Sequence, residues 1–296
     1  MKYSKKKLTI ENVKVDLIAK KYGTPSYCYS YSKLKSNIEN FKKSFQSFSP
    51  LICFAVKSNT NGNLIREIKK FGLGADVVSM GELMIAIKAG IDPKKIVFSG
   101  VGKTFDEIYY AISKNILLIN AESESEIKLI ERIAKLKRKR IEIGIRLNPN
   151  TDAKTLSQIS TGKKDNKFGV NSSTFIKLVN NYKNSKHIKL KCLSVHIGSQ
   201  ILDHKPYEKM LKSIIRILKK INYKFEFIDL GGGMGISYND QEKKLNYQKY
   251  CIAINKFLKE ILLFWLNAFF TNKFKSEGSN FISAFLIIIF LISKVL

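Results

Sequence analysis

Short apolar runs alternate along the chain with longer segments in which apolar residues recur every three to four positions. The short runs are rich in β-branched and aromatic residues, which favour strands, and the longer segments have the spacing of amphipathic helices. This alternation is typical of βα units around a parallel sheet. Strands are predicted at residues 51–57, 74–79, 95–100, 116–123, 141–149, 189–198 and 224–233. Helices are predicted at residues 62–71, 81–89, 105–112, 124–136, 172–181 and 207–221.

The number of βα units and the chemistry of the strand ends favour a closed barrel. Seven units followed by an eighth would close a TIM-like (β/α)8 barrel, whereas a doubly wound open sheet more often stops at about five or six strands. In such a barrel the loops after the C-terminal strand ends carry the functional groups. The predicted strands do end in polar residues or glycines, among them Lys57, Ser79, Ser99, Asn120, Arg146, His196 and the triplet Gly231 to Gly233. We therefore expect an α/β barrel with its functional site at this end.

The composition of the chain changes near residue 261. From there on the sequence is mostly apolar, with Glu277 as its single acidic residue, and it ends in the run FISAFLIIIFLISKVL. A helix that crosses a bilayer needs about 20 apolar residues, so a span by this run of 16 is marginal. We expect an N-terminal segment over residues 1–30, a barrel over 31–260, and an aberrant apolar tail over 261–296, and we expect no membrane partner. The alternative is a real apolar tail that docks on a partner or a membrane.

The charge of the chain is strongly positive. Lysine and arginine number 52 against 24 acidic residues, which gives a net charge of +28. A nucleic-acid-binding protein would cluster such charge on one face together with aromatic side chains. Here the lysines are spread over the whole chain, and the densest basic run, residues 135–140, is short. We interpret the excess as a surface that follows from a biased coding composition, and we expect no nucleic-acid partner.

Cysteine and histidine placement indicates neither a disulfide framework nor a metal site. Cys28, Cys53, Cys192 and Cys251 have no paired short spacing and lie in apolar stretches, as small core residues do in a reducing compartment. The basic start of the chain is not followed by the apolar region of a secretory signal. The three histidines have no partners at ligand spacing, so no metal is expected. These features predict a cytoplasmic protein.

Two features could together hold a phosphorylated aldehyde. Lys57 ends an apolar strand, where a buried amine needs a partner or a lowered pKa, and such amines form Schiff bases. Taken alone it is more simply one solvated lysine among many. The triplet Gly231 to Gly233 lets backbone N–H groups approach a phosphate, although glycines also serve turns for conformational reasons. In combination they indicate a cofactor such as pyridoxal phosphate (PLP).

Two further polar residues stand on predicted strands. His196 follows an apolar strand, where a histidine is more often a hydrogen-bonded core residue than a functional group. Arg146 is one of only six arginines in the chain. Among apolar neighbours its guanidinium needs a carboxylate or phosphate partner.

Nine segments together carry the pattern of a known family. They are KKYGTPSYCYS (20–30), FAVKSN (54–59), GADVVSMGEL (74–83), FSGVGKT (98–104), INAESESEI (119–127), RLNP (146–149), STGKKDNKFGV (160–170), VHIGSQ (195–200) and DLGGGMG (229–235). In order and spacing they agree over roughly residues 20 to 255. On these segments the chain resembles the fold type III PLP-dependent decarboxylases of basic amino acids, and among them most closely the diaminopimelate decarboxylases.

The resemblance implies a fold and an activity. It implies a barrel of the alanine racemase and decarboxylase type that holds PLP, followed by a C-terminal β-domain that the N-terminal segment joins. The implied reaction is the decarboxylation of meso-2,6-diaminopimelate to L-lysine, with the amino acid as small-molecule substrate and a homodimer as the assembly. An ornithine/arginine-type decarboxylase or a racemase on the same barrel is the alternative within enzymes, and a non-catalytic PLP-binding barrel is the alternative outside them.

The resemblance also implies roles for individual residues. Lys57 matches the lysine that forms the Schiff base with the cofactor, and His196 matches the histidine that stacks on the pyridine ring, so these two are the implied catalytic residues. Asp76 and Arg146 match positions that shape the cofactor pocket. Ser199 and the glycines match the positions that bind the phosphate, namely Gly231, Gly232 and Gly233.

The sequence departs from the family pattern at the eighth strand. The family motif there is Glu-Pro-Gly-Arg, whose glutamate is the partner of the pyridine nitrogen. Here the stretch reads Glu277-Gly278-Ser279-Asn280, so that Glu277 is the candidate for this contact and the proline and arginine are absent. The family's C-terminal β-domain has no counterpart in the sequence. We therefore expect a degenerate eighth strand, a truncated or frameshifted reading frame, and impaired activity of this chain.

Overall fold

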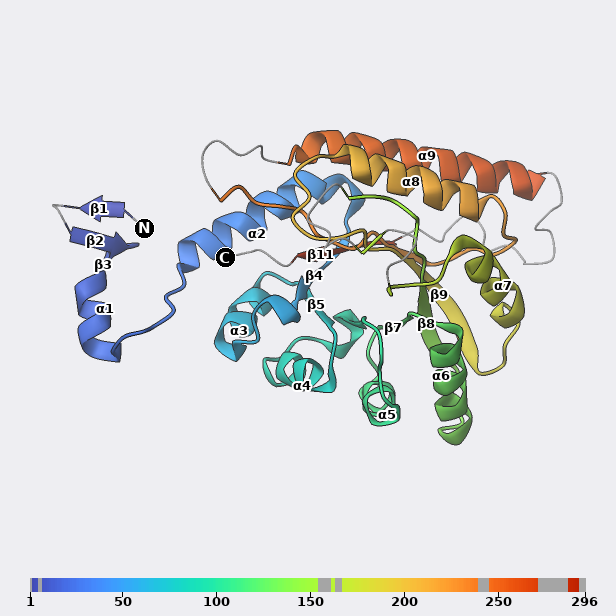
Figure 1. Ribbon diagram of the computed structural model, residues 1–296, viewed down its shortest axis with the longest axis horizontal. Helices are drawn as coiled ribbons and strands as arrows, with labels where there is room; N and C mark the ends of the chain where they lie inside the picture. Colours follow the sequence, from blue (N-terminus) through green and yellow to red (C-terminus); the bar gives the residue numbers. More distant parts are fainter. Residues whose placement is uncertain are drawn as a thin grey trace. The chain divides into compact units, whose positions relative to one another are not determined.

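The computed structural model describes residues 2–4, 7–153, 161–162, 167–238, 245–270 and 287–292. Two compact units divide the chain, the first ending at Ser44 and the second running from Phe45 to Ser293 (Figure 1). The second unit contains nearly all of the functional residues that the sequence predicts.

The first unit is a small sheet with two helices. Its strands β1 (Lys2–Ser4), β2 (Lys7–Ile10) and β3 (Val13–Lys14) form an antiparallel sheet in that order, followed by α1 (Val15–Tyr22) and α2 (Tyr31–Phe45). Glu11 lies in the turn between β2 and β3, and its carboxylate accepts hydrogen bonds from the Ser30 hydroxyl at 2.8 Å and the Ser32 N–H at 2.7 Å. These bonds connect the sheet to the segment that begins α2.

The second unit is a closed barrel of eight parallel strands. The strands follow one another around the barrel in the order β10, β11, β4, β5, β6, β7, β8, β9. Their bounds are β4 (Leu51–Ala55), β5 (Gly74–Val77), β6 (Ile96–Phe98), β7 (Leu118–Ala121), β8 (Ile141–Arg146), β9 (Ile188–Ser194), β10 (Phe227–Asp229) and β11 (Ile287–Ile292). The predicted α/β barrel is confirmed, and each of the seven predicted strands overlaps an observed one.

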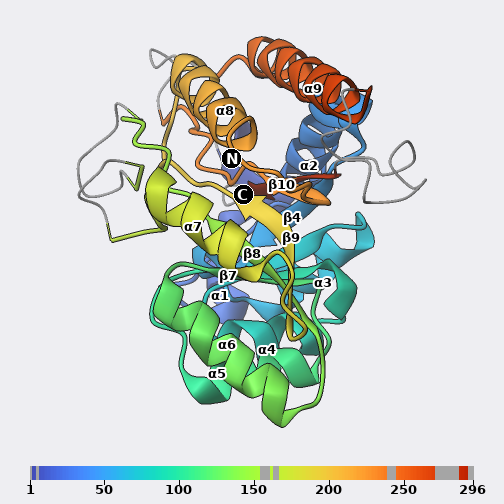
Figure 2. The same ribbon diagram turned by 90° about the vertical axis from the view of Figure 1, so that its right-hand side faces the viewer.

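Helices cover the outside of the barrel (Figure 2). Side-chain oxygens of Asn61, Ser79, Thr104, Ser123 and Asn171 accept hydrogen bonds from the first turns of α3 to α7 and so fix where these helices begin. The helices are α3 (Gly62–Lys70), α4 (Met80–Lys88), α5 (Phe105–Ser113), α6 (Glu124–Leu136), α7 (Ser172–Tyr182), α8 (Lys205–Leu218) and α9 (Tyr247–Phe270). Short 3₁₀ turns lie at Gln46–Phe48, Val56–Ser58 and Pro93–Lys95. The six predicted helices are confirmed, and α9 lies beyond them.

The eighth strand comes from the apolar tail. Strand β11 pairs in parallel with β10 on one side, where Phe227 is opposite Ile287, and with β4 on the other, where Leu51 is opposite Ile289. The strand forms although its sequence lacks the family motif, because a run of β-branched and aromatic residues suits a parallel barrel strand. Of the helices that the structure describes, none combines the length and apolar character needed to cross a bilayer.

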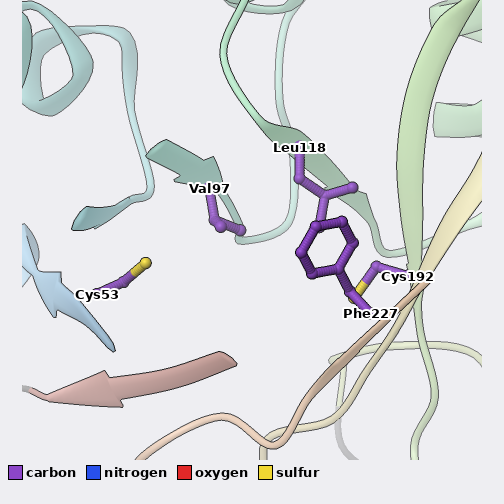
Figure 3. Close-up of a cluster of buried hydrophobic side chains, with 5 residues drawn as sticks. All are labelled: Cys53, Val97, Leu118, Cys192 and Phe227. Atoms are coloured by element: carbon purple, nitrogen blue, oxygen red, sulfur yellow. The ribbon is translucent and has the colours of Figure 1, made fainter. Parts of the chain in front are cut away.

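The barrel interior is apolar in one layer and polar in the next. Figure 3 shows the apolar layer, in which five buried side chains from five different strands cluster together: Cys53, Val97, Leu118, Cys192 and Phe227. Side chains of a strand face the same side at every second position. Two positions further on, the same strands therefore point a second set inward, which includes Ser99, Asn120, Ser194 and Asp229. This polar layer lies nearer the C-terminal strand ends.

The cysteine prediction is partly wrong. All four cysteines are free thiols, and Cys53 and Cys192 are core residues as expected. Cys28 is exposed and Cys251 is half-buried, because both lie on segments outside the barrel interior.

Candidate active site

Asn120 is the centre of the polar layer. Its amide nitrogen donates hydrogen bonds to the Ser99 hydroxyl at 3.3 Å, the Ser194 hydroxyl at 3.2 Å and the Asp229 carboxylate at 3.0 Å. The Ser194 hydroxyl also donates to Asp229 at 2.9 Å, and the Ser99 hydroxyl donates to the Asp76 carboxylate at 2.6 Å. One connected network thus links side chains from β5, β7, β9 and β10 with Ser99, which follows β6.

The amide oxygen of Asn120 has no hydrogen-bond partner among the described residues. It lies over Gly144 of β8, where an added Cβ would be only 2.0 Å from this oxygen. A glycine is therefore needed opposite Asn120, since only a residue without a side chain leaves room for the amide.

Two buried carboxylates belong to this network. Burial raises the pKa of Asp229 to about 6, helped by the negative charge of Asp76 and opposed by hydrogen bonds from the Gly231 N–H, Ser194 and Asn120. Burial also raises the pKa of Asp76, and the positive charge of Lys57 opposes that rise most strongly. Their exposed fractions are 1% each. The network therefore retains a proton on Asp229 up to weakly acidic pH.

Arg146 has the carboxylate partner that its position in the sequence requires. Its guanidinium donates to the Glu122 carboxylate at 2.7 Å, in an ion pair whose members are both buried. Glu122 also accepts from the backbone N–H groups of Gly100 at 3.1 Å and Gly169 at 2.8 Å. On its other side Arg146 lies 4.9 Å from the centre of the Phe168 ring. These contacts hold the guanidinium at the end of β8.

Lys57 lies in the 3₁₀ turn directly after β4, and its side chain is exposed. It forms no ion pair within the part of the chain that the structure describes. Its positive charge nevertheless opposes the raised pKa of Asp76 and helps to lower the pKa of His196. An amine at the open end of the barrel, close to these groups, is accessible to an incoming aldehyde.

His196 follows β9 and is a neutral imidazole. Burial, together with the positive charges of Arg146 and Lys57, holds the pKa of His196 well below its ordinary value. Its Nδ1 accepts a hydrogen bond from the Gly232 N–H at 3.2 Å. The glycine loop is thus attached directly to the histidine that the resemblance implies as catalytic.

The glycine loop after β10 fits a phosphate. Gly231 and Gly233 have φ values of +67° and +80°, which favour glycine. A Cβ on Gly233 would lie 1.7 Å from the Gly198 carbonyl oxygen, so no side chain fits there. The Gly233 N–H donates no hydrogen bond within the described residues, which leaves it available to an anion. Ser199, the other predicted phosphate ligand, directly follows Gly198 and is half-buried.

The structure brings most of the predicted site residues to one end of the barrel. Lys57, Asp76, Arg146, His196 and the loop Gly231 to Gly233 follow or end strands β4, β5, β8, β9 and β10. Glu277, the predicted partner of the pyridine nitrogen, lies outside the described residues, and β11 begins only at Ile287.

Sequence reasoning missed several residues that support this end of the barrel. Glu122, Ser194 and Asp229 were not predicted, and neither was Lys103, whose buried ammonium donates to Glu126 at 2.6 Å and to the Asn120 carbonyl at 2.8 Å. For Ser194 and Asp229 the signal was the alternation of inward positions two residues beyond the core residues Cys192 and Phe227, which can be read only once the strand faces are known. Glu122 and Lys103 follow strands β7 and β6 outside this alternation, and their burial is seen only in the fold.

Comparison with known proteins identifies one family. A family model described as "Pyridoxal-dependent decarboxylase, pyridoxal binding domain" matches residues 31–265. The chain is 43% identical over 224 residues to a diaminopimelate decarboxylase of Helicobacter pylori, and 38% identical over 247 residues to one of Aquifex aeolicus. These alignments cover 75% and 82% of this chain.

A solved structure agrees with this match. The crystal structure of the Helicobacter pylori diaminopimelate decarboxylase complexed with L-lysine superposes with a TM-score of 0.82 at 35% identity, over 93% of this chain and 65% of that one. The chain spans 55% of the length of the Helicobacter relative and 58% of the Aquifex relative.

Proposed function

The chain belongs to the family of pyridoxal-dependent decarboxylases, and we propose that its barrel serves the decarboxylation of meso-2,6-diaminopimelate to L-lysine. The observation that carries the proposal is the meeting of Lys57, neutral His196, Arg146 and the glycine loop at one end of the barrel. The choice of substrate is supported by identities of about 40% to proteins with that activity.

PLP is the cofactor of this family, and the residues present fit it. The Gly233 N–H and Ser199 would hold its phosphate, since the loop has room only for glycine backbone next to Gly198. Lys57 would hold its aldehyde carbon, because its amine is exposed at the open end of the barrel. His196 would lie against its ring. Asp76 and Arg146, both buried, would form the floor and wall of the pocket.

When bound, PLP supplies an electron-withdrawing ring that stabilises the negative charge left on the α-carbon after carbon dioxide departs. The protein's own groups prepare the site for this chemistry. Neutral His196 adds no positive charge beside the ring, because burial, together with the positive charges of Arg146 and Lys57, keeps its pKa low. Arg146 holds its charge at the strand end through the pair with Glu122. Lys57 is the amine that the substrate amine would have to displace.

We further propose that this chain alone decarboxylates weakly or not at all. The support is that Glu277-Gly278-Ser279-Asn280 stands where the family has Glu-Pro-Gly-Arg, so the proline and arginine of that motif are missing. An ornithine- or arginine-directed decarboxylase, a racemase, and a barrel that binds PLP without turnover remain the competing functions.

Binding of PLP to the full chain is the first experiment. We expect a visible absorbance band on addition of PLP and, after borohydride reduction, a mass increase on the peptide that contains Lys57. Lys57→Ala should lose both signals. The matched variant Lys94→Ala, which replaces an exposed lysine in the 3₁₀ turn before β6, should keep them. A chain that shows neither band nor labelled Lys57 contradicts the proposal.

Release of carbon dioxide then separates the competing functions. With PLP and meso-diaminopimelate we expect little or no release above a Lys57→Ala control. Strong release would overturn the proposed impairment and support the activity. Release from L-ornithine or L-arginine but not from diaminopimelate would overturn the proposed substrate, and racemisation of an amino acid would replace the reaction type.

The remaining proposals concern assembly and location. We propose a homodimer of the kind expected for the family. Light scattering at several protein concentrations would measure the molecular mass in solution and test this. We propose a cytoplasmic location, supported by four free thiols, of which Cys28 is exposed.

A further inference from the structure

One residue of the glycine loop is held from both sides, through the peptide units that precede and follow it. The Gly232 carbonyl accepts a hydrogen bond from the Tyr207 hydroxyl at 3.1 Å, and the Gly232 N–H donates to His196 Nδ1 at 3.2 Å. Tyr207 belongs to α8, whereas the glycine follows β10 and the histidine follows β9. A tyrosine on an outer helix is thus connected through one residue to the imidazole of the site.

The Tyr207 hydroxyl occupies a position where a phenylalanine would pack equally well. Tyr207 is completely buried, and its ring stacks on Tyr250 of α9 with centroids 4.3 Å apart and an interplanar angle of 27°. Burial raises the pKa of Tyr207 well above its ordinary value, so the hydroxyl keeps its proton and acts as a donor. Burying a hydroxyl costs free energy unless it is hydrogen-bonded, and the Gly232 carbonyl is the partner that offsets this cost.

The hydrogen bond to Gly232 also determines the tautomer of His196. A neutral imidazole has one nitrogen that donates and one that accepts. Because the Gly232 N–H points at Nδ1, Nδ1 must be the acceptor, and the proton lies on Nε2. The low pKa of His196 prevents a second proton from binding to Nδ1 and breaking this contact. The orientation of one glycine peptide therefore fixes which imidazole nitrogen carries hydrogen.

We propose that Tyr207 is a positioning residue for the site. By holding the Gly232 carbonyl it keeps Gly232 in place, so that the Gly232 N–H stays on His196 Nδ1 and the imidazole keeps its proton on Nε2. It also orients the Gly233 N–H, which shares a peptide unit with that carbonyl, into the phosphate position. The first half of this proposal depends only on the contacts of the chain itself. The second half rests on the proposed function, because it assumes that a phosphate binds to the loop.

The test uses Tyr207→Phe in the full chain, with Tyr223→Phe as the matched control. Tyr223 also donates its hydroxyl to a backbone carbonyl, that of Leu190 at 2.5 Å, but Leu190 lies toward the N-terminal end of β9. Each variant removes one hydrogen bond from a tyrosine hydroxyl to a backbone carbonyl, so a general loss of stability should affect both variants alike.

The tautomer is read by nitrogen-15 NMR without any added cofactor. The chain has only three histidines, so His196 can be assigned by substituting the other two. In the unsubstituted protein we expect Nδ1 to resonate as an unprotonated ring nitrogen and Nε2 as a protonated one. Tyr207→Phe should move both resonances toward intermediate values, and Tyr223→Phe should leave them unchanged.

The cofactor affinity gives a second reading. We expect Tyr207→Phe to weaken PLP binding about fivefold, the change that corresponds to one ordinary hydrogen bond, with no change in Tyr223→Phe. If PLP does not bind to any form of the chain, the proposed function fails, while the NMR result still tests the role of Tyr207.

Three results would overturn the proposal. One is an Nδ1-protonated His196 in the unsubstituted protein. This result can be obtained even if neither variant folds. The second is a Tyr207→Phe spectrum and affinity equal to those of the unsubstituted protein. The third is an equal change in both variants, which would indicate general destabilisation rather than positioning.

Discussion

Replacing Asp229 by asparagine should change how the stability of the barrel depends on pH. In the folded chain the carboxyl group ionises near pH 6, against an ordinary value of 3.8. Between these values the folded protein holds a proton that the unfolded chain has lost. The contribution of Asp229 to stability is therefore fully present below pH 3.8, decreases as the pH rises to about 6, and stays at its lower level above that.

The size of the effect follows from the two pKa values. Each pKa unit corresponds to about 1.36 kcal/mol, so a change from 3.8 to about 6 lowers the free energy of unfolding by about 3 kcal/mol at neutral pH. Asp229→Asn cannot ionise and avoids this loss. Its side-chain oxygen can still accept from the Gly231 N–H, which now bonds to the carboxylate at 2.9 Å.

Urea unfolding at pH 4 and pH 7 measures the effect. The single tryptophan, Trp265 on α9, is 6% exposed and provides the fluorescence signal. We expect the stability of Asp229→Asn relative to the unsubstituted chain to be about 2.4 kcal/mol more favourable at pH 7 than at pH 4, because the unfolded carboxyl is already partly ionised at pH 4. Titrating groups that do not interact with Asp229 cancel in this difference, because both proteins contain them, whereas Asp76 interacts with Asp229 and does not cancel completely.

The control for this measurement is Asp203→Asn. Asp203 is exposed, and a hydrogen bond from the Lys205 N–H lowers its pKa, so its removal should produce a small trend of the opposite sign. A relative stability of Asp229→Asn that is the same at both pH values would refute the reasoning about its buried carboxyl group.

Two further substitutions test the packing and the charge of the site. Gly144→Ala should lower the free energy of unfolding by about 3 kcal/mol in urea titrations, because its Cβ would lie 2.0 Å from the Asn120 amide oxygen. Glu122→Gln should cost about 3 kcal/mol, measured in the same way, because the buried Arg146 charge loses its carboxylate partner.

Each of these has a control in the same chain. Gly62→Ala should be neutral or slightly stabilising, since nothing lies within 4 Å of a Cβ at that helical position. Glu124→Gln breaks only exposed ion pairs with Lys128 and Lys177 and should cost less than about 1 kcal/mol. Losses as large in the controls as in Gly144→Ala and Glu122→Gln would contradict the assigned causes.

The elements of the barrel were predictable because their signals are local. Each strand from β4 to β10 is a short β-branched run bounded by turn residues, and each of the helices α3 to α8 has an amphipathic repeat. The signals of β11 and α9 are weaker, since both lie in apolar stretches that suit a buried helix as well as a strand. Residues Ile287–Ile292 form a strand because they pair with β10 and β4. This pairing joins residues far apart in the chain, so a local pattern does not reveal it.

The site was predictable only in part. Lys57, His196 and the glycine loop are recognisable in the sequence because they stand at the ends of predicted strands. The position of Arg146 among apolar residues predicts that it has a carboxylate or phosphate partner. That this carboxylate is Glu122 depends on two strands side by side. The bond from Asn120 to Asp229 joins residues 109 positions apart, so no local pattern in the sequence could reveal it.

The two layers of the barrel interior have a kinetic consequence for proton exchange. Beneath the polar layer, the apolar cluster of Cys53, Val97, Leu118, Cys192 and Phe227 lies between Asp229 and the N-terminal strand ends. Among the described residues, Asp229 is therefore nearer to the C-terminal strand ends and the glycine loop than to the opposite end of the barrel. A ligand seated at the glycine loop would slow proton exchange between Asp229 and water for as long as it stays bound.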